Sequence, residues 1–240
     1  MLNHVKQCNL SLVIDEIEQK KIDINAVLDG DAKDHMVHIA AYYNTTEDIM
    51  KVLVTHDANI NLVNGNGVNA LAYSIIMGNG KVTSYLLSLP NLLLNNRDCN
   101  NGTIMHHCIR YLRYDVLHHL LKTFKDIDLE VKHSVEGSVL EYACSLGKED
   151  LVKALIKAGS NINVMDKDNK FLIIKCIEMK RYGVARILID SKCIINCFCP
   201  MGNTPLYYAV LDGNIDISTL LLRNAANPRA RSRERPLPPS

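Results

Sequence analysis

Hydrophobic and small residues recur along this chain with a period of about 33 residues. A six-residue segment with an apolar third residue and a small sixth residue begins at six places, and successive starts lie 34, 34, 35, 33 and 33 residues apart. The segments are His35–Ala40, Asn69–Ser74, Thr103–Cys108, Ser138–Ala143, Phe171–Cys176 and Thr204–Ala209. Such a period is typical of a solenoid, in which one supersecondary unit is stacked many times.

A second landmark keeps the same period. Pairs of aliphatic residues follow each segment, at Leu53-Val54, Leu86-Leu87, Leu120-Leu121, Leu155-Ile156, Leu188-Ile189 and Leu221-Leu222. A short helix with a small residue on its packing face can approach its neighbours closely, and an aliphatic pair suits a second helix that covers it. Each unit is therefore predicted to contain two helices.

The clearest copies identify a resemblance. Gly202-Asn203-Thr204-Pro205-Leu206 and Ala158-Gly159-Ser160-Asn161-Ile162-Asn163 are similar to the signature of the ankyrin-repeat family. The resemblance covers residues 1 to about 227 and implies an all-α ankyrin-repeat solenoid of helix-turn-helix units joined by β-hairpin loops. The pattern departs at Phe171-Leu172, which replaces Thr-Pro, and at one extra residue around Thr45-Thr46.

The same resemblance divides the chain into three parts. Residues 1–28 are expected to form a degenerate N-terminal capping repeat, in which only the second helix, Leu10–Gln19, is recognisable. Residues 29–227 are expected to form six ankyrin repeats. Residues 228–240 are too polar and proline-rich to fold alone, so a disordered basic tail is expected there.

Ankyrin repeats bind proteins with their hairpin tips and with the inner face of each first helix. By register, the inner-face positions lie seven and eight residues after each segment start, and at least one member of every pair is apolar or aromatic. The predicted partner-binding residues are Tyr42, Tyr43, Ile76, Met77, Arg110, Tyr111, Leu146, Met179 and Leu211. Aromatic residues, Met and Arg are enriched at interface centres. The alternative is that several of these side chains pack against the next repeat.

Other candidate sites lie at the hairpin tips, in the tail and between repeats. The tips around Asp166 and Met201 are expected to offer charged and apolar side chains, respectively. Arg233, Pro236 and Pro239 match the spacing of an SH3 ligand, although a basic stretch is also typical of a nuclear-import signal or of a non-native extension. By family resemblance, Asn61 and Asn163 are possible acceptors for asparaginyl β-hydroxylation, while bridging of the backbone between repeats is a sufficient structural role.

Cysteine and histidine residues are the candidates for a metal or catalytic site. Cys108, Cys144 and Cys176 occupy small packing positions, which predicts buried free thiols in a reducing compartment. Cys193, Cys197 and Cys199 have ligand-like spacing, but no paired Cys-x-x-Cys or nearby His completes a zinc set, so no metal is expected. His106 occupies the His position of the repeat signature, which favours a structural hydrogen bond over catalysis.

Composition excludes several functions. The chain has a net charge of +1, and its last 13 residues hold four Arg and one Glu, so the remaining residues carry 23 basic and 25 acidic side chains, a net charge of −2. A nearly neutral array lacks the footprint of a nucleic-acid binder. No apolar run is long enough to span a membrane, and no nucleophile elbow, zinc-protease helix or kinase motif is present.

The sequence thus predicts a non-catalytic protein–protein interaction module, a scaffold or adaptor without cofactor. We expect it to be monomeric and located in the cytoplasm, or also in the nucleus. The alternative is an inhibitory adaptor of a transcription factor, similar to the ankyrin-type inhibitors of Rel proteins, although the acidic tail of that group is missing. The third possibility is an enzyme, which would require a catalytic domain beyond this chain or an unrecognised site.

Overall fold

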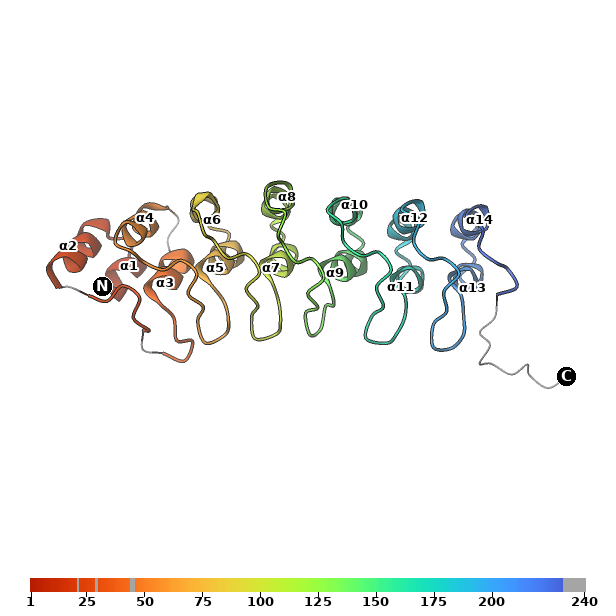
Figure 1. Cartoon of the computed structure of the whole chain (residues 1–240), viewed down its shortest axis with the longest axis horizontal. Coiled ribbons are helices and arrows are strands. Elements are labelled where there is room, and N and C mark those ends of the chain that lie inside the picture. Colours follow the sequence, from red (N-terminus) through yellow and green to blue (C-terminus); the bar gives the residue numbers. More distant parts are fainter. Residues whose placement is uncertain (21, 29, 44–45, 231–240) are drawn as a thin grey trace. The chain divides into compact units, whose positions relative to one another are not determined.

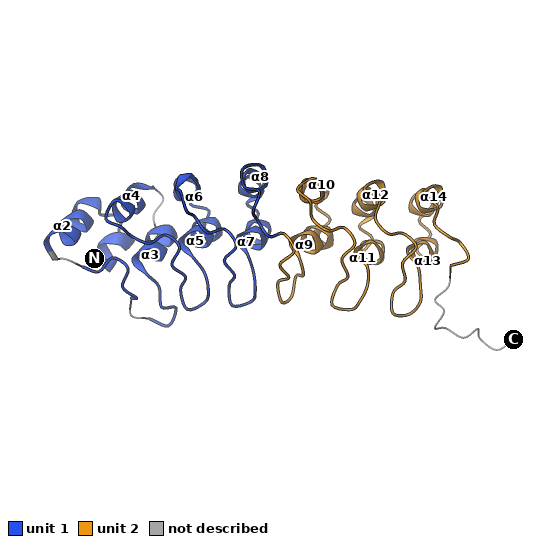
Figure 2. Cartoon of the chain, in the orientation of Figure 1, with its two compact units in different colours: residues 1–128 blue, residues 129–240 orange. Residues whose placement is uncertain are grey.

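The computed structural model describes residues 1–20, 22–28, 30–43 and 46–230. These residues form fourteen α-helices, which follow one another as helix pairs joined by long loops (Figure 1). The chain divides into two compact units, Met1–Asp128 (unit 1) and Leu129–Ser240 (unit 2) (Figure 2). The prediction of an all-α repeat solenoid is confirmed within each unit.

Unit 1 contains four helix pairs. Its first helices α1, α3, α5 and α7 pack on one another in order, and each carries a second helix beside it. The helices are α1 (Leu2–Lys6), α2 (Leu10–Lys20), α3 (Met36–Tyr43), α4 (Asp48–Thr55), α5 (Ala70–Met77), α6 (Gly80–Ser88), α7 (Ile104–Arg110) and α8 (Tyr114–Thr123).

Unit 2 contains three helix pairs with the same arrangement. The first helices α9, α11 and α13 pack in order, and so do the second helices α10, α12 and α14. Their bounds are α9 (Val139–Leu146), α10 (Glu149–Lys157), α11 (Leu172–Glu178), α12 (Tyr182–Asp190), α13 (Pro205–Leu211) and α14 (Ile215–Arg223).

Three of the described first helices, α5, α9 and α13, begin at a residue whose side chain caps them. The side chains of Asn69, Ser138 and Thr204 accept hydrogen bonds from backbone N–H groups in the first turns of α5, α9 and α13. Such caps satisfy donors that have no partner inside the helix. Gly78 and Gly147 end α5 and α9 with φ of 74° and 71°, a left-handed conformation that glycine adopts without strain.

The core of each unit is formed by the residues that set the sequence period. The small sixth residues are buried, as in Ala40, Ala143 and Ala209, each 0% exposed. The first member of every aliphatic pair is also 0% exposed: Leu53, Leu86, Leu120, Leu155, Leu188 and Leu221. Burial of this regular set stabilises the contacts between successive repeats, since each repeat packs mainly on its neighbours.

The beginning of the chain is more regular than the sequence predicted. The described part of residues 1–28 contains two helices, α1 and α2, and α1 packs on both α2 and α3. The expectation that only the second helix is recognisable therefore understated this repeat. The N-terminal ammonium group of Met1 forms an ion pair with Glu16 and ties α1 to α2. No helix among the described residues is long and apolar enough to cross a membrane.

Candidate functional site

Six predicted partner-binding residues lie at the C-terminal ends of three successive first helices in unit 1. We call Tyr42, Tyr43, Ile76, Met77, Arg110 and Tyr111 the unit 1 stripe. Tyr42 and Tyr43 end α3 and are 38% and 44% exposed, Met77 ends α5 and is 40% exposed, and Tyr111 follows α7 and is 38% exposed. Ile76 and Arg110 are half-buried.

Aromatic contacts give the stripe a defined surface. The ring of Tyr42 lies 4.6 Å from that of Tyr43 and 5.7 Å from that of Tyr73, and the Lys6 ammonium lies 5.4 Å from the centre of the Tyr43 ring. Part of Tyr42 therefore serves packing between repeats, as the alternative reading expected. Sequence reasoning missed two residues of this surface. Tyr73 lies within α5 rather than at its end, and Lys6 lies on α1, which was not recognised as a helix.

Side chains from the following repeat hold the helix ends that carry the stripe. Asn79 donates from Nδ2 to the carbonyl oxygen of Ala41 at 2.6 Å, and Arg113 donates from Nε to that of Ile75 at 3.2 Å. In unit 2, Arg181 donates from Nε to the carbonyl oxygen of Ser145 at 3.0 Å. Carbonyl groups in the last turn of a helix lack a donor from a following turn, and a cation suits the negative end of the helix dipole. The Ile75 oxygen also accepts from Gly78 N at 3.2 Å. The backbone that carries the exposed side chains is thereby held by the following repeat.

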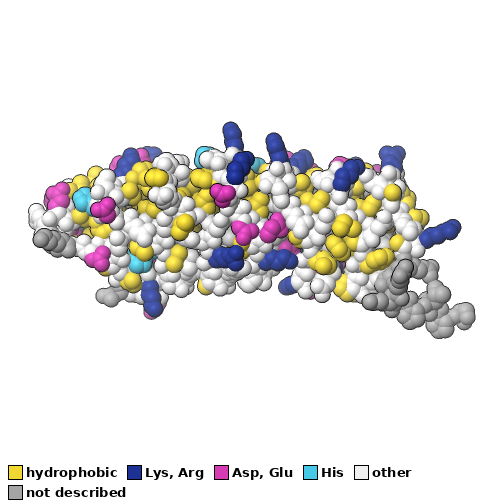
Figure 3. All heavy atoms as spheres, in the orientation of Figure 1, with side chains coloured by type: hydrophobic (Ala, Val, Ile, Leu, Met, Phe, Trp, Pro, Cys, Tyr) yellow, Lys and Arg dark blue, Asp and Glu magenta, His cyan; other side chains and the backbone are white. Residues whose placement is uncertain are grey.

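Unit 2 carries the remaining three predicted residues, which we call the unit 2 stripe. Leu146 ends α9 and is 38% exposed, Met179 follows α11 and is 40% exposed, and Leu211 ends α13 and is 70% exposed. Hydrophobic side chains gather over α11 and α13 in the space-filling view (Figure 3).

Charged groups beside the unit 2 stripe are mutually paired. Lys170 Nζ lies 2.7 Å from Glu178 Oε2, and Lys180 Nζ lies 3.1 Å from Asp212 Oδ1. Hydrogen bonds from the Tyr182 hydroxyl and from Lys180 lower the pKa of Asp212. The stripe thus presents apolar side chains between ion pairs.

The hairpin tips differ in what they expose. Asp166 was expected to offer charge, but it is 8% exposed, and its Oδ1 accepts hydrogen bonds from the backbone N–H groups of Asp168 and Lys170 at 2.9 and 3.0 Å. That expectation was wrong, because the carboxylate turns inward and shapes the turn. Met201 is 60% exposed, as a contact residue at a tip requires.

Asn61 and Asn163 bridge successive repeats. Asn61 donates from Nδ2 to the carbonyl oxygen of Asn91 at 2.8 Å and accepts from Leu93 N at 2.9 Å, and Asn163 Oδ1 accepts from Ile194 N at 2.8 Å. Asn25, Asn95 and Asn196 form the same bridge. In the remaining repeat the equivalent residue is Glu130, whose Oε1 accepts a hydrogen bond from Asn161 N. The structural role is confirmed, and hydroxylation of Asn61 and Asn163 stays a prediction.

The buried thiols behave as packing residues. Cys108, Cys144 and Cys176 are free and at most 2% exposed, as the sequence predicted. Burial raises the pKa of Cys108 to about 12, and a hydrogen bond with the Cys176 thiol, together with burial, raises the pKa of Cys144. Cys108 and Cys144 therefore remain neutral thiols rather than nucleophiles at neutral pH.

The cysteine run before the last helix pair is also buried. Burial raises the pKa of Cys193 and of Cys197 to about 12, which opposes the thiolate form that zinc requires. For Cys199, burial acts in the same direction but is outweighed by the hydrogen bond with the Tyr208 hydroxyl and by backbone N–H groups, so that its pKa is lowered. Among the described residues, no three His, Cys, Asp or Glu side chains are placed to hold a metal ion.

The remaining predicted residues have structural roles or fall outside the described ranges. His106 Nδ1 accepts a hydrogen bond from Thr103 N at 3.2 Å, which confirms its structural role at the start of α7. Arg233, Pro236 and Pro239, the candidate SH3 ligand, lie outside the described residues, and so does the rest of the tail beyond residue 230.

Known proteins share this architecture. The family model of ankyrin repeats (three copies) matches residues 22–133 and 140–232. An ankyrin repeat protein of Acanthamoeba polyphaga mimivirus is 22% identical over 227 residues, which are 92% of this chain and 29% of that protein. The neurogenic locus notch homolog protein 1 of Homo sapiens is 25% identical over 136 residues, 56% of this chain and 5% of that protein. The chain therefore spans less than a third of the length of these relatives.

Among solved structures, the ankyrin repeat domain of Bcl-3, described as a unique member of the IkappaB protein family, has a similar fold. The TM-score is 0.77 at 18% sequence identity, and the match covers 92% of this chain and 96% of that chain. At this identity the similarity establishes the fold alone.

Proposed function

The chain belongs to the ankyrin-repeat family. On that premise we propose that it is a non-catalytic module that binds a protein partner through the C-terminal ends of its first helices. The observation that carries the proposal is the unit 1 stripe, in which Tyr43, Met77 and Tyr111 are 38–44% exposed on successive repeats. Tyrosine and methionine side chains at the centre of an interface contribute large contact areas.

The support of the stripe by its neighbours favours binding. Asn79 and Arg113 hold the ends of α3 and α5. Anchors that are already ordered in the free protein lose less conformational entropy when the partner binds, so more of the contact energy contributes to affinity. The unit 2 stripe, Leu146, Met179 and Leu211, offers a second apolar surface of the same kind.

A substitution series tests this proposal. The partner is first identified by proximity labelling and pull-down with the intact chain, and its dissociation constant is then measured by calorimetry. Tyr43→Ala, Met77→Ala and Tyr111→Ala are each expected to weaken binding by about 1–3 kcal/mol, because truncation removes an anchor. The melting temperature should change little, since these side chains are more than a third exposed.

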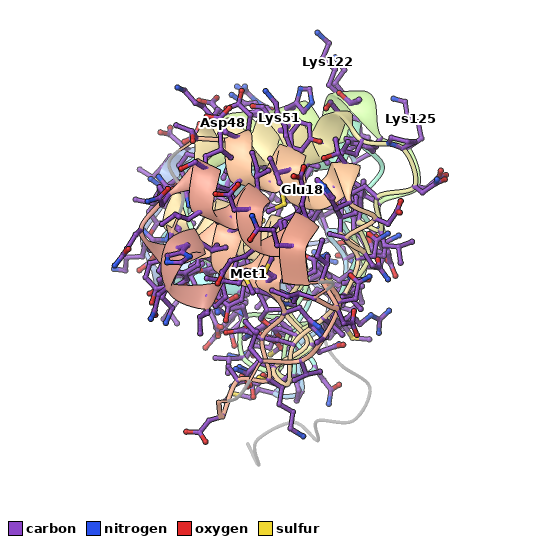
Figure 4. The ribbon with its side chains drawn as sticks, turned by 90° about the vertical axis from the view of Figure 1, so that its left-hand side faces the viewer. Met1, Glu18, Asp48, Lys51, Lys122 and Lys125 are labelled. Carbon is purple, nitrogen blue, oxygen red and sulfur yellow. The ribbon has the colours of Figure 1, made fainter. Side chains whose placement is uncertain are left out.

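Controls separate binding from folding. Lys122→Ala alters a residue that projects outward from the end of α8 (Figure 4), and Lys153→Ala alters an exposed residue of α10. Neither should change affinity or melting. If the three stripe variants instead melt at lower temperature while the folded protein binds normally, the stripe is a packing surface and the site assignment is wrong.

The second candidate function is an inhibitory adaptor of a transcription factor. The fold similarity to the ankyrin domain of Bcl-3 favours testing it. Recovery of a Rel-type transcription factor as the direct partner, with loss of binding in Tyr43→Ala, would support this narrower function. A direct partner of another class would leave the general module in place.

We also propose that the chain acts in the cytoplasm or nucleus as a monomer. All eight cysteines are free thiols, as a reducing compartment favours. Microscopy of the tagged chain and light scattering of the purified chain test these two points separately.

A further inference from the structure

A small polar cavity lies in unit 1 between two consecutive hairpin loops, the one that precedes α5 and the one that precedes α7. Gly67, Asn69, Asn96, Asp98 and Gly102 form much of its wall, and its volume is ≈ 10 Å³. About this volume is the minimum that admits one water molecule. Most space between the repeats is instead filled by apolar side chains.

Two asparagines, Asn69 and Asn96, line this cavity, and each has an amide donor without a partner. Asn69 is 1% exposed, and its Oδ1 accepts a hydrogen bond from Ala72 N at 2.8 Å. That bond fixes the orientation of the amide, so its Nδ2 is the free end. Within the described part of the chain, neither Asn69 Nδ2 nor Asn96 Nδ2 has a hydrogen-bond partner, although both atoms are buried. Buried donors of this kind are costly unless something accepts from them.

Asn96 is unusual for its place in the repeat. The residue that directly follows the bridging residue is apolar in every other repeat: Ala26, Leu62, Val131, Val164 and Cys197. An amide at a position that is otherwise apolar, with its donor buried, requires a hydrogen-bond partner of its own. Asn96 and Asn69 therefore each bring one unpartnered donor to the wall of the same cavity.

We propose that this cavity is a specific site for one water molecule, whose oxygen accepts hydrogen bonds from Asn69 Nδ2 and Asn96 Nδ2. The carboxylate of Asp98, 7% exposed, completes the site as an acceptor for the water hydrogens. Its Oδ1 already accepts from the backbone N–H groups of Asn100 and Gly102 at 2.8 and 2.7 Å, and its Oδ2 lies 3.3 Å from His107 Nε2.

The chemistry of the wall selects water over an ion. An anion would also accept from the two amides, but the Asp98 carboxylate repels it and the small volume excludes most anions. A cation would meet two N–H₂ donors rather than lone pairs. Water both accepts and donates, and in this site it joins the base of one hairpin to the next.

Two measurements on the full chain test the site. A crystal structure at about 1.5 Å resolution should show a density peak about 2.7–3.2 Å from both Nδ2 atoms. In solution, the side-chain amides of Asn69 and Asn96 should show magnetisation transfer from a long-lived water molecule. Either a dry cavity in which both amides bond to protein atoms, or an anomalous peak of chloride at the site, would overturn the proposal.

The variant Asn96→Leu supplies the residue found at the equivalent position 62 and removes one donor. It should abolish the long-lived water signal at Asn69 while the chain stays folded. Asn100→Ala, on the same hairpin but exposed, is the matched control and should leave the signal unchanged. Retention of the water signal in Asn96→Leu contradicts the assigned ligands. If Asn96→Leu fails to fold, the density and the amide signals of the unaltered chain decide the question alone.

Discussion

One histidine shows how a single repeat residue carries both structure and pH dependence. His38 is fully buried, its Nδ1 accepts a hydrogen bond from His35 N at 2.8 Å, and its Nε2 lies 3.0 Å from the carbonyl oxygen of Leu62. Nε2 must therefore carry the proton and donate it to that oxygen. Burial lowers the pKa of His38, and although Asp34 raises it in part, the neutral ring is favoured.

Acid should therefore destabilise unit 1 through His38. Because the folded-state pKa lies below the ordinary value of 6.5, the unfolded chain takes up the proton first, and the free energy of unfolding falls as the pH drops below about 6.5 toward the folded-state pKa. Urea unfolding between pH 7.5 and 5 measures this slope. His38→Gln should lower the stability at pH 7.5 and flatten the slope, whereas His118→Gln, on an exposed position of α8, should keep it. Equal slopes for the chain and His38→Gln would contradict the argument.

Residue roles were predictable where the repeat register determines them. The register placed Tyr42, Met77 and Leu146 at helix ends and gave His106 its structural bond. It failed for Asp166, because the direction of that carboxylate depends on the backbone N–H groups of its own turn. Asn96 was also missed as a site residue, since its importance lies in a cavity that only the packed hairpins create.

At the scale of helices, the same repeat position can be covered or open. The residue six positions after the signature start is 1% exposed in Cys144 and Ile177, but 62% exposed in Val210. The residue three positions after the start shows the same contrast, from 0% in Ile174 to 49% in Tyr207. In unit 2, α11 packs on α13, whereas the far side of α13 has no following helix pair among the described residues.

This contrast predicts the cost of two matched substitutions. Ile177→Ala should lower the free energy of unfolding by about 2–5 kcal/mol, because it leaves a cavity between α11 and its neighbours. Val210→Ala should change it by less than about 0.5 kcal/mol, because the side chain is largely in solvent. Urea unfolding of both variants makes the comparison. A large loss for Val210→Ala would mean that the outer side of α13 is covered in solution.

Helix prediction succeeded where the signature is strong and was incomplete elsewhere. The five-residue α1 carries no signature, so packing on α2 and α3 rather than local sequence supports it. Phe171 replaces the capping residue of α11, yet the helix begins as expected. Leu172 N donates to the carbonyl oxygen of Val164 at 3.0 Å, and Met165 and Phe171 form an antiparallel β-bridge. Tertiary contacts here replace a local signal.

At the scale of the whole chain, stability is distributed over contacts between neighbours. Each first helix packs on the first helices before and after it within its unit, as α11 does on α9 and α13. In such an array the free energy of opening one repeat depends on that repeat and its neighbours, so unfolding need not be all-or-none. The repeat period predicted this architecture directly, while the division into two units could not be inferred from a pattern that continues through residue 128.

Hydrogen exchange should therefore reveal how far a local defect spreads. In Ile177→Ala, backbone amides of α9, α11 and α13 should exchange faster, because these helices share the weakened contacts. The amides of α3 and α5, which belong to repeats of unit 1 much earlier in the sequence, should keep their protection. Val210→Ala should alter neither set. If Ile177→Ala instead accelerates all protected amides by one common factor, the chain opens as a single cooperative body and the nearest-neighbour account fails.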